Sequence, residues 1–279
     1  MEPESRAADL ARYYDLDLLS DPGDRDFYLD LAAAGAGPIL ELAAGSGRLA
    51  VPLAASGHDM TGVDNDPAML DRARIAWAGA EPPGRGGRGR GAGSLTLVEH
   101  DLTTLDLPER FNLVILALNS LLLLDGRAAQ GRALNKMRAH LAPGGRAVVD
   151  IWLPTPQDLE LYDGRQVLDW IRTDPGTGER VAKTTVARYD AATQRATLTT
   201  TFDAAHPDAQ PADAPPRSTT REDAVTFINA GELLELAGRA GLEPKAVLGD
   251  YSGTPWSDTS ERAVLIAGTG WSHARGVAP

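Results

Sequence analysis

The strongest constraint on the fold is a regular alternation of two apolar patterns between residues 38 and 152. Short aliphatic segments that are typical of buried strands alternate with longer segments whose apolar residues recur at helical spacing. The patterns predict strands at 38–42, 58–66, 95–99, 112–118 and 146–152, and helices at 48–56, 67–79 and 127–141. Strands that are separated by helices form parallel sheets covered by helices on both faces. The first half of the chain is therefore predicted to be an α/β domain.

The alternation breaks after Trp152 and returns near residue 227. Segments rich in Thr, Val and aromatic residues, at 166–173, 180–189 and 195–203, predict an antiparallel meander. A proline-rich loop is expected at 207–218, before a helix at 229–241 and strands at 243–251 and 262–268. The chain is thus predicted to form one domain from residues 1–154 and 227–279. A β-rich insertion, 155–226, would serve as a substrate wall, a lid or a dimer contact.

Composition narrows the range of partners. The formal net charge of −12 repels phosphate backbones and argues against nucleic acid as a partner. The chain has no cysteine, which excludes disulfides and thiolate metal sites, and its five histidines show no metal-binding spacing. It also lacks a basic, apolar leader and any run of about 18 apolar residues. We therefore expect a cytoplasmic protein with no metal and no membrane partner.

A turn containing two glycines follows the first predicted strand, in the sequence ELAAGSGRLA from Glu41 to Ala50. Its GxGxxG/A pattern fits a dinucleotide, but the Glu41 carboxylate suits a cationic ligand such as S-adenosylmethionine better than a pyrophosphate. Asp64 ends the second strand, where an acid could accept the ribose hydroxyls of either ligand. Asp101 follows the third strand, where it could accept from an adenine amino group. The later residues favour S-adenosylmethionine.

Four stretches, taken together, resemble the class I S-adenosylmethionine-dependent methyltransferases. These are ILELAAGSGRLA, VDNDPAML, EHDLTTLDLPERF and LAPGGRAVVDIW, and they occur in the family's order. The first is also similar to the motif of small-molecule N- and O-methyltransferases from natural-product pathways. The resemblance implies an α/β fold with a doubly wound, Rossmann-like, seven-stranded and mostly parallel sheet, carrying the antiparallel insertion after strand five. It also implies the cofactor S-adenosyl-L-methionine, with S-adenosyl-L-homocysteine as its product.

The resemblance further implies a role for each matching position. Residues that would contact the cofactor are Tyr14, Glu41, Ala43, Gly45, Gly47, Asp64, Asn65, Met69, Asp101 and Leu102. Tyr13 and Tyr14 would form an N-terminal lid, with Tyr13 also facing the substrate. Structural alternatives remain for several of these residues: Asp64 as a helix cap, Asp101 as a turn cap, Met69 as a core residue, and either tyrosine as a packing aromatic.

Ligands of open α/β sheets bind outside the carboxyl ends of the strands. The predicted substrate residues at this edge are Asn119, Trp152, Tyr251 and Trp256. No general base stands out, and His100, Asp258 and Glu160 are only weak candidates. An amine acceptor that arrives neutral would need no base, whereas a hydroxyl would need one.

The predicted function is methyl transfer to nitrogen or oxygen of a small, natural-product-like acceptor. Alternatives are a cyclase or other non-methylating enzyme on the same fold, an NAD-dependent oxidoreductase, and an RNA methyltransferase. The RNA methyltransferase alternative rests on the arginine–glycine stretch Gly84–Gly93, which is predicted to be a solvated surface loop. A homodimer is compatible with the insertion.

Overall fold

The computed structural model describes residues 3–80, 93–205 and 216–269. Its contacts divide the chain into two compact units. The larger unit comprises Gly23–Leu121, Gly126–Leu153 and Ile228–Pro279. The other, called the insertion unit below, comprises Met1–Pro22, Leu122–Asp125 and Pro154–Phe227.

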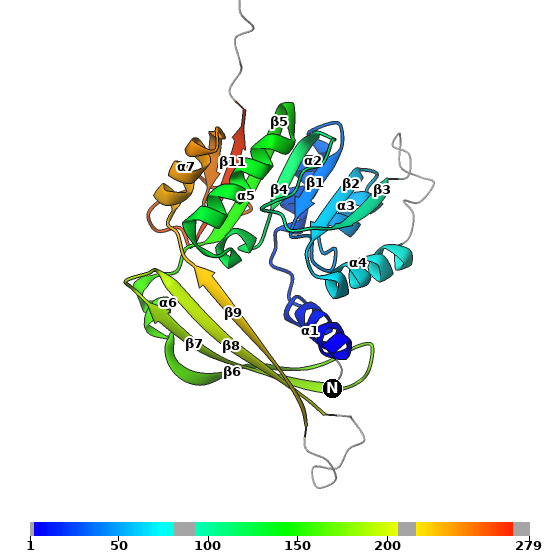
Figure 1. The fold of residues 1–279 in the computed structure, drawn as a ribbon, viewed down its shortest axis with the longest axis vertical. Helices are drawn as coiled ribbons and strands as arrows, with labels where there is room; N and C mark the ends of the chain where they lie inside the picture. The colour runs from blue at the N-terminus through cyan, green and yellow to red at the C-terminus, as the bar shows by residue number, and fades with distance from the viewer. Residues whose placement is uncertain (1–2, 81–92, 206–215, 270–279) are drawn as a thin grey trace, which may run out of the picture. The chain divides into compact units, whose positions relative to one another are not determined.

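The larger unit contains a seven-stranded sheet in the order β10-β11-β5-β4-β1-β2-β3 (Figure 1). The strands are β1 (Ile39–Leu42), β2 (Asp59–Asp64), β3 (Ser94–Glu99), β4 (Phe111–Leu116), β5 (Leu141–Trp152), β10 (Glu243–Leu248) and β11 (Arg262–Gly268). Of these, β11 runs antiparallel to both of its neighbours, while β1 to β5 are mutually parallel. The predicted fold class is confirmed.

Helices cover this sheet in two groups that pack separately. One group contains α2 (Arg25–Ala33), α3 (Ala50–Ala55) and α4 (Pro67–Gly79), and the other contains α5 (Gly126–His140) and α7 (Ala230–Arg239). Local sequence explains where two of them begin. Pro67 occupies the first turn of α4 behind the cap Asp66, whose side chain accepts from the Ala68 N–H. Asn229 and Glu232 form a reciprocal capping box at α7.

The insertion unit contains a four-stranded antiparallel sheet, β6-β7-β8-β9. Its strands are β6 (Asp163–Thr173), β7 (Arg180–Asp190), β8 (Arg195–Ala205) and β9 (Arg217–Thr226), with the short helix α6 (Pro156–Glu160) before them. Helix α1 (Pro3–Asp17) packs on this sheet and shares its core of Tyr13, Leu16, Val181, Phe202 and Ala204. Residues 3–22 therefore group with the insertion, whereas the sequence division placed them in the larger domain. The functional roles of the two parts remain predictions.

Some elements differ from those expected. Helices α1 and α2 and strand β9 were not predicted, because their sequences mix charged and small residues without a clean apolar period. Strand β5 begins at Leu141 and continues through Pro143–Gly145 after a shift in register, where a helix end had been expected. Two predicted loops, 84–93 and 207–218, lie mostly outside the described residues. Within the described parts of the chain, no helix is long and apolar enough to cross a bilayer.

Candidate active site

The glycine turn lies at the carboxyl end of β1 and is fastened to the end of β2. The Gly45 N–H donates to the Asp64 carboxylate at 2.8 Å, and the Ala44 N–H donates to the Val63 carbonyl at 2.9 Å. Ala43, Gly45 and Gly47 all have positive φ, at 55°, 55° and 83°. Ala43 adopts this left-handed conformation without being glycine, which costs about 1–2 kcal/mol. Such strain persists only where surrounding contacts enforce it, and it is enriched at ligand sites.

Gly47 has a packing role that needs no ligand. A Cβ atom there would lie 2.8 Å from Val51 Cγ2 and 3.1 Å from Ala73 Cβ. The missing side chain lets the turn sit directly against α4, which follows the second strand. The predicted contact of Gly47 with a cofactor remains a prediction beside this structural function.

Asp64 acts on the turn and does not cap a helix. Its second carboxylate oxygen accepts from the Asp66 N–H at 2.9 Å, and burial raises the pKa of the Asp64 carboxyl. The cap of α4 is Asp66 instead. The helix-cap alternative for Asp64 is therefore wrong, and the carboxylate organises the space between the ends of β1 and β2.

The structure shows Asp101 in the alternative role of a turn cap. One of its oxygens accepts from both the N–H and the hydroxyl of Thr103, at 2.7 and 2.8 Å, and these bonds lower the pKa of Asp101. Its carboxylate is exposed, so the second oxygen remains available to a ligand. Asn65 is also exposed, and Met69 and Leu102 are half-buried. Strands β2 and β3 pair in parallel, with Asp64 opposite Glu99. Asn65, Met69, Asp101 and Leu102 therefore all lie near the carboxyl ends of these two strands.

Glu41 is more deeply buried than its predicted role assumed. The residue is 4% exposed, and its Oε2 atom has no hydrogen-bond partner among the described residues. Burial raises the pKa of Glu41 to about 8, although Arg48 and the Ala50 N–H oppose the shift. The folded protein therefore holds this carboxyl largely protonated at neutral pH. A protonated Glu41 carries no negative charge to repel a pyrophosphate, which corrects the expectation from the sequence.

A buried ion pair behind the turn was missed by sequence reasoning. Both terminal nitrogens of Arg48 bond the two oxygens of Asp24, at 2.5 and 2.8 Å, and Asp24 is fully buried. Nearby Tyr28 is fully buried too, and its hydroxyl has no partner among the described residues. The pair fixes the start of α2 to the turn. No periodicity or spacing in the sequence indicates that Asp24 and Arg48 meet.

Asp150, another residue that the sequence did not reveal, contacts several residues at the carboxyl ends of the strands, here called the strand-end rim. Its fully buried carboxylate accepts from the Tyr251 hydroxyl at 2.5 Å and from the Leu118 N–H at 3.1 Å, and it pairs with Arg262. Asn119, at φ 66°, donates its N–H to the Asp150 carbonyl, and its side-chain oxygen accepts from the Trp152 N–H. Three predicted substrate residues, Asn119, Trp152 and Tyr251, are therefore brought together.

The other predicted residues have less distinctive surroundings. Trp256 is half-buried on the loop after β10, and its indole N–H has no partner among the described residues. His100, Asp258 and Glu160 are exposed, and no contact distinguishes any of them as a base. In the described ranges, no group of three acidic, histidine or cysteine side chains could hold a metal.

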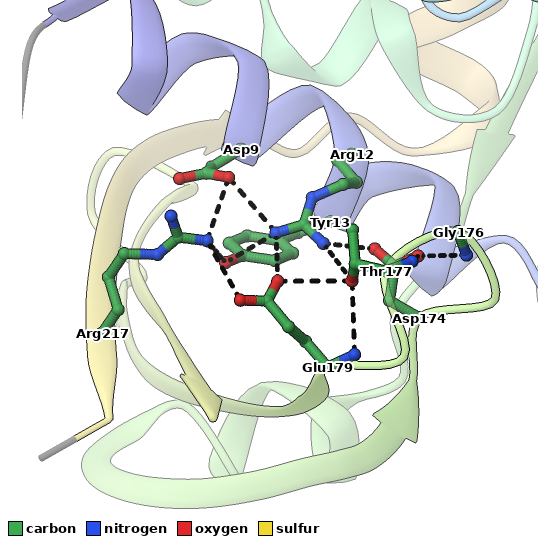
Figure 2. A network of polar contacts seen from close by, with 8 residues as sticks. All are labelled: Asp9, Arg12, Tyr13, Asp174, Gly176, Thr177, Glu179 and Arg217. Carbon is green, nitrogen blue, oxygen red and sulfur yellow. Dashed lines mark hydrogen bonds and ion pairs between the residues drawn. The ribbon is translucent and has the colours of Figure 1, made fainter. Parts of the chain in front are cut away.

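Tyr13 is a core residue of the insertion unit, which corrects its predicted contact with substrate. Its ring is fully buried and stacks on Phe202, with the centroids 4.9 Å apart. Figure 2 shows its hydroxyl among the guanidinium groups of Arg12 and Arg217, which donate to it at 3.4 and 3.5 Å. Tyr13 is therefore a packing aromatic of the insertion unit, as the alternative interpretation of the sequence had it. Tyr14, half-buried on α1, keeps its predicted role only as a prediction.

The strand order and the turn between β1 and β2 define a methyltransferase-type α/β domain. Residues 39–145 match the family model described as a methyltransferase domain, whereas no curated protein matches the chain. The structure of the CcbJ methyltransferase from Streptomyces caelestis is 25% identical, with a TM-score of 0.66 over 89% of this chain and 90% of that one.

Two further structures share the fold at lower identity. An S-adenosylmethionine-dependent methyltransferase from Clostridium acetobutylicum is 17% identical, covering 94% of this chain and 98% of that one with a TM-score of 0.72. The sugar N-methyltransferase KedS8 from Streptoalloteichus is 21% identical, covering 92% of each chain with a TM-score of 0.68. Residues 39–145 thus form a methyltransferase domain, and the fold of the chain is shared with S-adenosylmethionine-dependent methyltransferases.

Proposed function

We propose that the protein transfers the methyl group of S-adenosylmethionine to nitrogen or oxygen of a small, natural-product-like acceptor. The observation that carries the proposal is the left-handed turn from Ala43 to Gly47, which Asp64 fastens at the edge where ligands of such sheets bind. Similarity to KedS8, a sugar N-methyltransferase, supports an acceptor of this class.

The residues around the turn fit the cofactor. The Glu41 oxygen beside the turn has no partner among the described residues, and the cofactor's ammonium group would favour the ionised form of this carboxyl and donate to it. The Ala43 carbonyl would accept from that ammonium, while Gly45 and Gly47 admit the methionine portion. Asp64 would hold the ribose hydroxyls. Asn65, Met69, Asp101 and Leu102 would surround the adenine.

When bound, the cofactor supplies a methyl group that is activated by its sulfonium leaving group. The protein's part is to align the acceptor and to exclude water. We assign the acceptor-binding rim to Asn119, Trp152, Tyr251 and Trp256. Tyr251 donates its hydroxyl to Asp150, and burial together with that carboxylate raises the pKa of Tyr251 far above its ordinary value. Tyr251 therefore positions an acceptor without acting as a base, and an amine acceptor would have to arrive neutral.

Three finer expectations belong to this proposal. The net charge of −12 favours small or cationic acceptors over nucleic acid. A cytoplasmic location and a homodimer remain expectations, which fractionation and sedimentation of the native protein would test.

The cofactor site can be tested by calorimetry with S-adenosylhomocysteine. We expect binding by the wild type, and a loss of about 1–3 kcal/mol for Asp64→Ala, since buried ribose hydroxyls would lose their acceptor. Asp59→Ala, at the exposed start of the same strand, is the matched control and should bind normally. Equal affinity of Asp64→Ala and wild type would remove Asp64 from the site. Binding of NAD in place of S-adenosylhomocysteine would overturn the proposed function.

A further inference from the structure

A pocket of about 630 Å³ opens on one face of the insertion sheet. Strand pairing explains its floor, because Thr185, Thr200 and Arg221 are direct cross-strand neighbours, as are Ala187, Leu198 and Asp223. Cross-strand neighbours share a face, so these six side chains form two adjacent rows. The volume lies in the range of small-molecule sites, about 300–1,000 Å³.

The charged groups lining the pocket are matched in number and in position. Arg165 pairs with Asp163 at 2.5 Å, and Arg221 pairs with Asp223 at 2.7 Å. Lys183 lies 3.6 Å from Asp169 and also pairs with Asp17 of α1 at 2.9 Å. Every cation in the lining thus has a carboxylate beside it. The pocket has no excess of either sign that would attract an anion or a cation.

Hydrogen-bonding groups of both kinds remain available in the same lining. Arg221 uses its Nε for Asp223, and its two terminal nitrogens make no bond to any described residue. The Thr185 hydroxyl donates to Asp169 Oδ2 at 2.7 Å, and Lys183 lies 3.6 Å from the same oxygen, which leaves Asp169 Oδ1 without a hydrogen bond from any described residue. Tyr162 contributes a hydroxyl that has no partner among the described residues. Both donors and acceptors are therefore available to a ligand in the pocket.

Apolar side chains complete the lining, from Leu161, Val167, Ala187 and Leu198. Leu161 and Val167 are 67% and 51% exposed, so much of their aliphatic surface is open to a ligand. They offer a surface for the carbon face of a ring, and polar groups lie beside them, since Val167 pairs directly with Thr185 across the strands. This mixture of apolar wall and convergent polar groups is typical of ligand sites.

We propose that this pocket binds an uncharged, hydroxyl-rich ring, of the carbohydrate type, as a recognition site for the acceptor. A hydroxyl both donates and accepts, so it can use the Arg221 nitrogens and the Asp169 and Asp223 oxygens together. A phosphate only accepts and would meet three carboxylates, whereas an ammonium only donates and would meet three cations. The recognition role rests on the proposed function; the binding of a neutral ring does not.

The test uses three probes that share one ring and differ in charge: methyl glucoside, glucosamine and glucose 6-phosphate. Methyl NMR signals of Leu161, Val167, Ala187 and Leu198 report on the pocket, and those of Leu70, in the core of the larger unit, serve as a reference. We expect methyl glucoside at millimolar concentration to shift the pocket signals alone. The two charged probes should bind at least about fivefold more weakly, the loss expected for roughly one mismatched hydrogen bond.

Two tryptophan variants form the matched pair. Leu198→Trp fills the pocket and should abolish the shifts, whereas Leu168→Trp, at a 56% exposed position outside the lining, should retain them. Tighter binding of glucose 6-phosphate or glucosamine would overturn the proposal, as would the absence of shifts with all three probes. A change of oligomeric state in Leu198→Trp, with no sugar response in the wild type, would assign this face to a contact between copies. Loss of S-adenosylhomocysteine binding with an intact sugar response would refute the proposed function alone.

Discussion

At the scale of single residues, the site depends on side chains whose chemistry is changed by burial. Glu41 occupies a motif position that was expected to carry a negative charge. It is instead held protonated, with one oxygen orphaned beside the glycine turn. Asp150 is buried as well, but Arg262, Tyr251 and Leu118 all donate to its carboxylate. The two buried carboxyl groups, of Glu41 and Asp150, thus differ in role because their hydrogen-bond partners differ.

Glu41 should make stability depend on pH. Its pKa rises from an ordinary value near 4.5 to about 8 on folding, so between these values the folded protein binds more protons than the unfolded chain. Stability should therefore fall as pH rises through this window, by at most about 1.4 kcal/mol per pH unit. Glu41→Gln should remove this contribution, so its advantage over wild type should grow from about pH 5 to pH 8. Urea unfolding across that range measures it.

The control is Glu99→Gln at the exposed end of β3, which should follow the wild type at every pH. A Glu41→Gln variant whose stability parallels that of wild type at all pH values would show that Glu41 ionises normally.

At the scale of elements, helix α1 belongs to the insertion sheet through a dense set of ion pairs (Figure 2). Arg12 contacts Asp174 at 2.5 Å, Glu179 at 2.8 Å and Asp9 at 3.2 Å. At the C-terminal end of the helix, Asp17 accepts from the Trp170 indole and pairs with Lys183. These contacts join α1 to the turn between β6 and β7 and to β6 and β7 themselves. The helix and the sheet therefore behave as one body.

Removing the Arg12 guanidinium should loosen α1. Arg12→Met leaves three carboxylates without their shared cation, a change that costs about 3–5 kcal/mol where such a pair is buried. Hydrogen exchange of the α1 amides should accelerate, while exchange in α4 stays unchanged. Arg165→Met removes a guanidinium that is 80% exposed and should change little. Equal exchange rates in both variants would mean that α1 is held by its apolar contacts alone.

At the scale of the whole molecule, the two units have separate hydrophobic cores. The core of the larger unit contains Leu53, Met60 and Ile115, and that of the insertion unit contains Tyr13, Val181 and Phe202. The chain enters the insertion after β5 and leaves it before α7. The larger sheet therefore combines β1 to β5, which precede the insertion, with β10 and β11, which follow it. Units with separate cores can unfold separately.

Calorimetry should therefore resolve two thermal transitions. Leu53→Ala, which truncates a side chain only 1% exposed, should lower the transition of the larger unit, at a cost of about 2–5 kcal/mol. Arg12→Met should lower only the transition of the insertion unit. A single transition that both variants shift together would show that the units unfold cooperatively.

The sequence by itself determined the alternation of β1 to β5 with their helices, the antiparallel insertion and the glycine turn. Each of these depends on neighbours along the chain: apolar period, Pro67 behind Asp66, and glycines at positive φ. Only the tertiary structure decided that Asp24 meets Arg48, that Asp150 gathers Asn119, Trp152 and Tyr251, and that Tyr13 is buried against Phe202. Those contacts join residues far apart in sequence, and no local pattern encodes them, because burial and pairing arise when strands and helices pack.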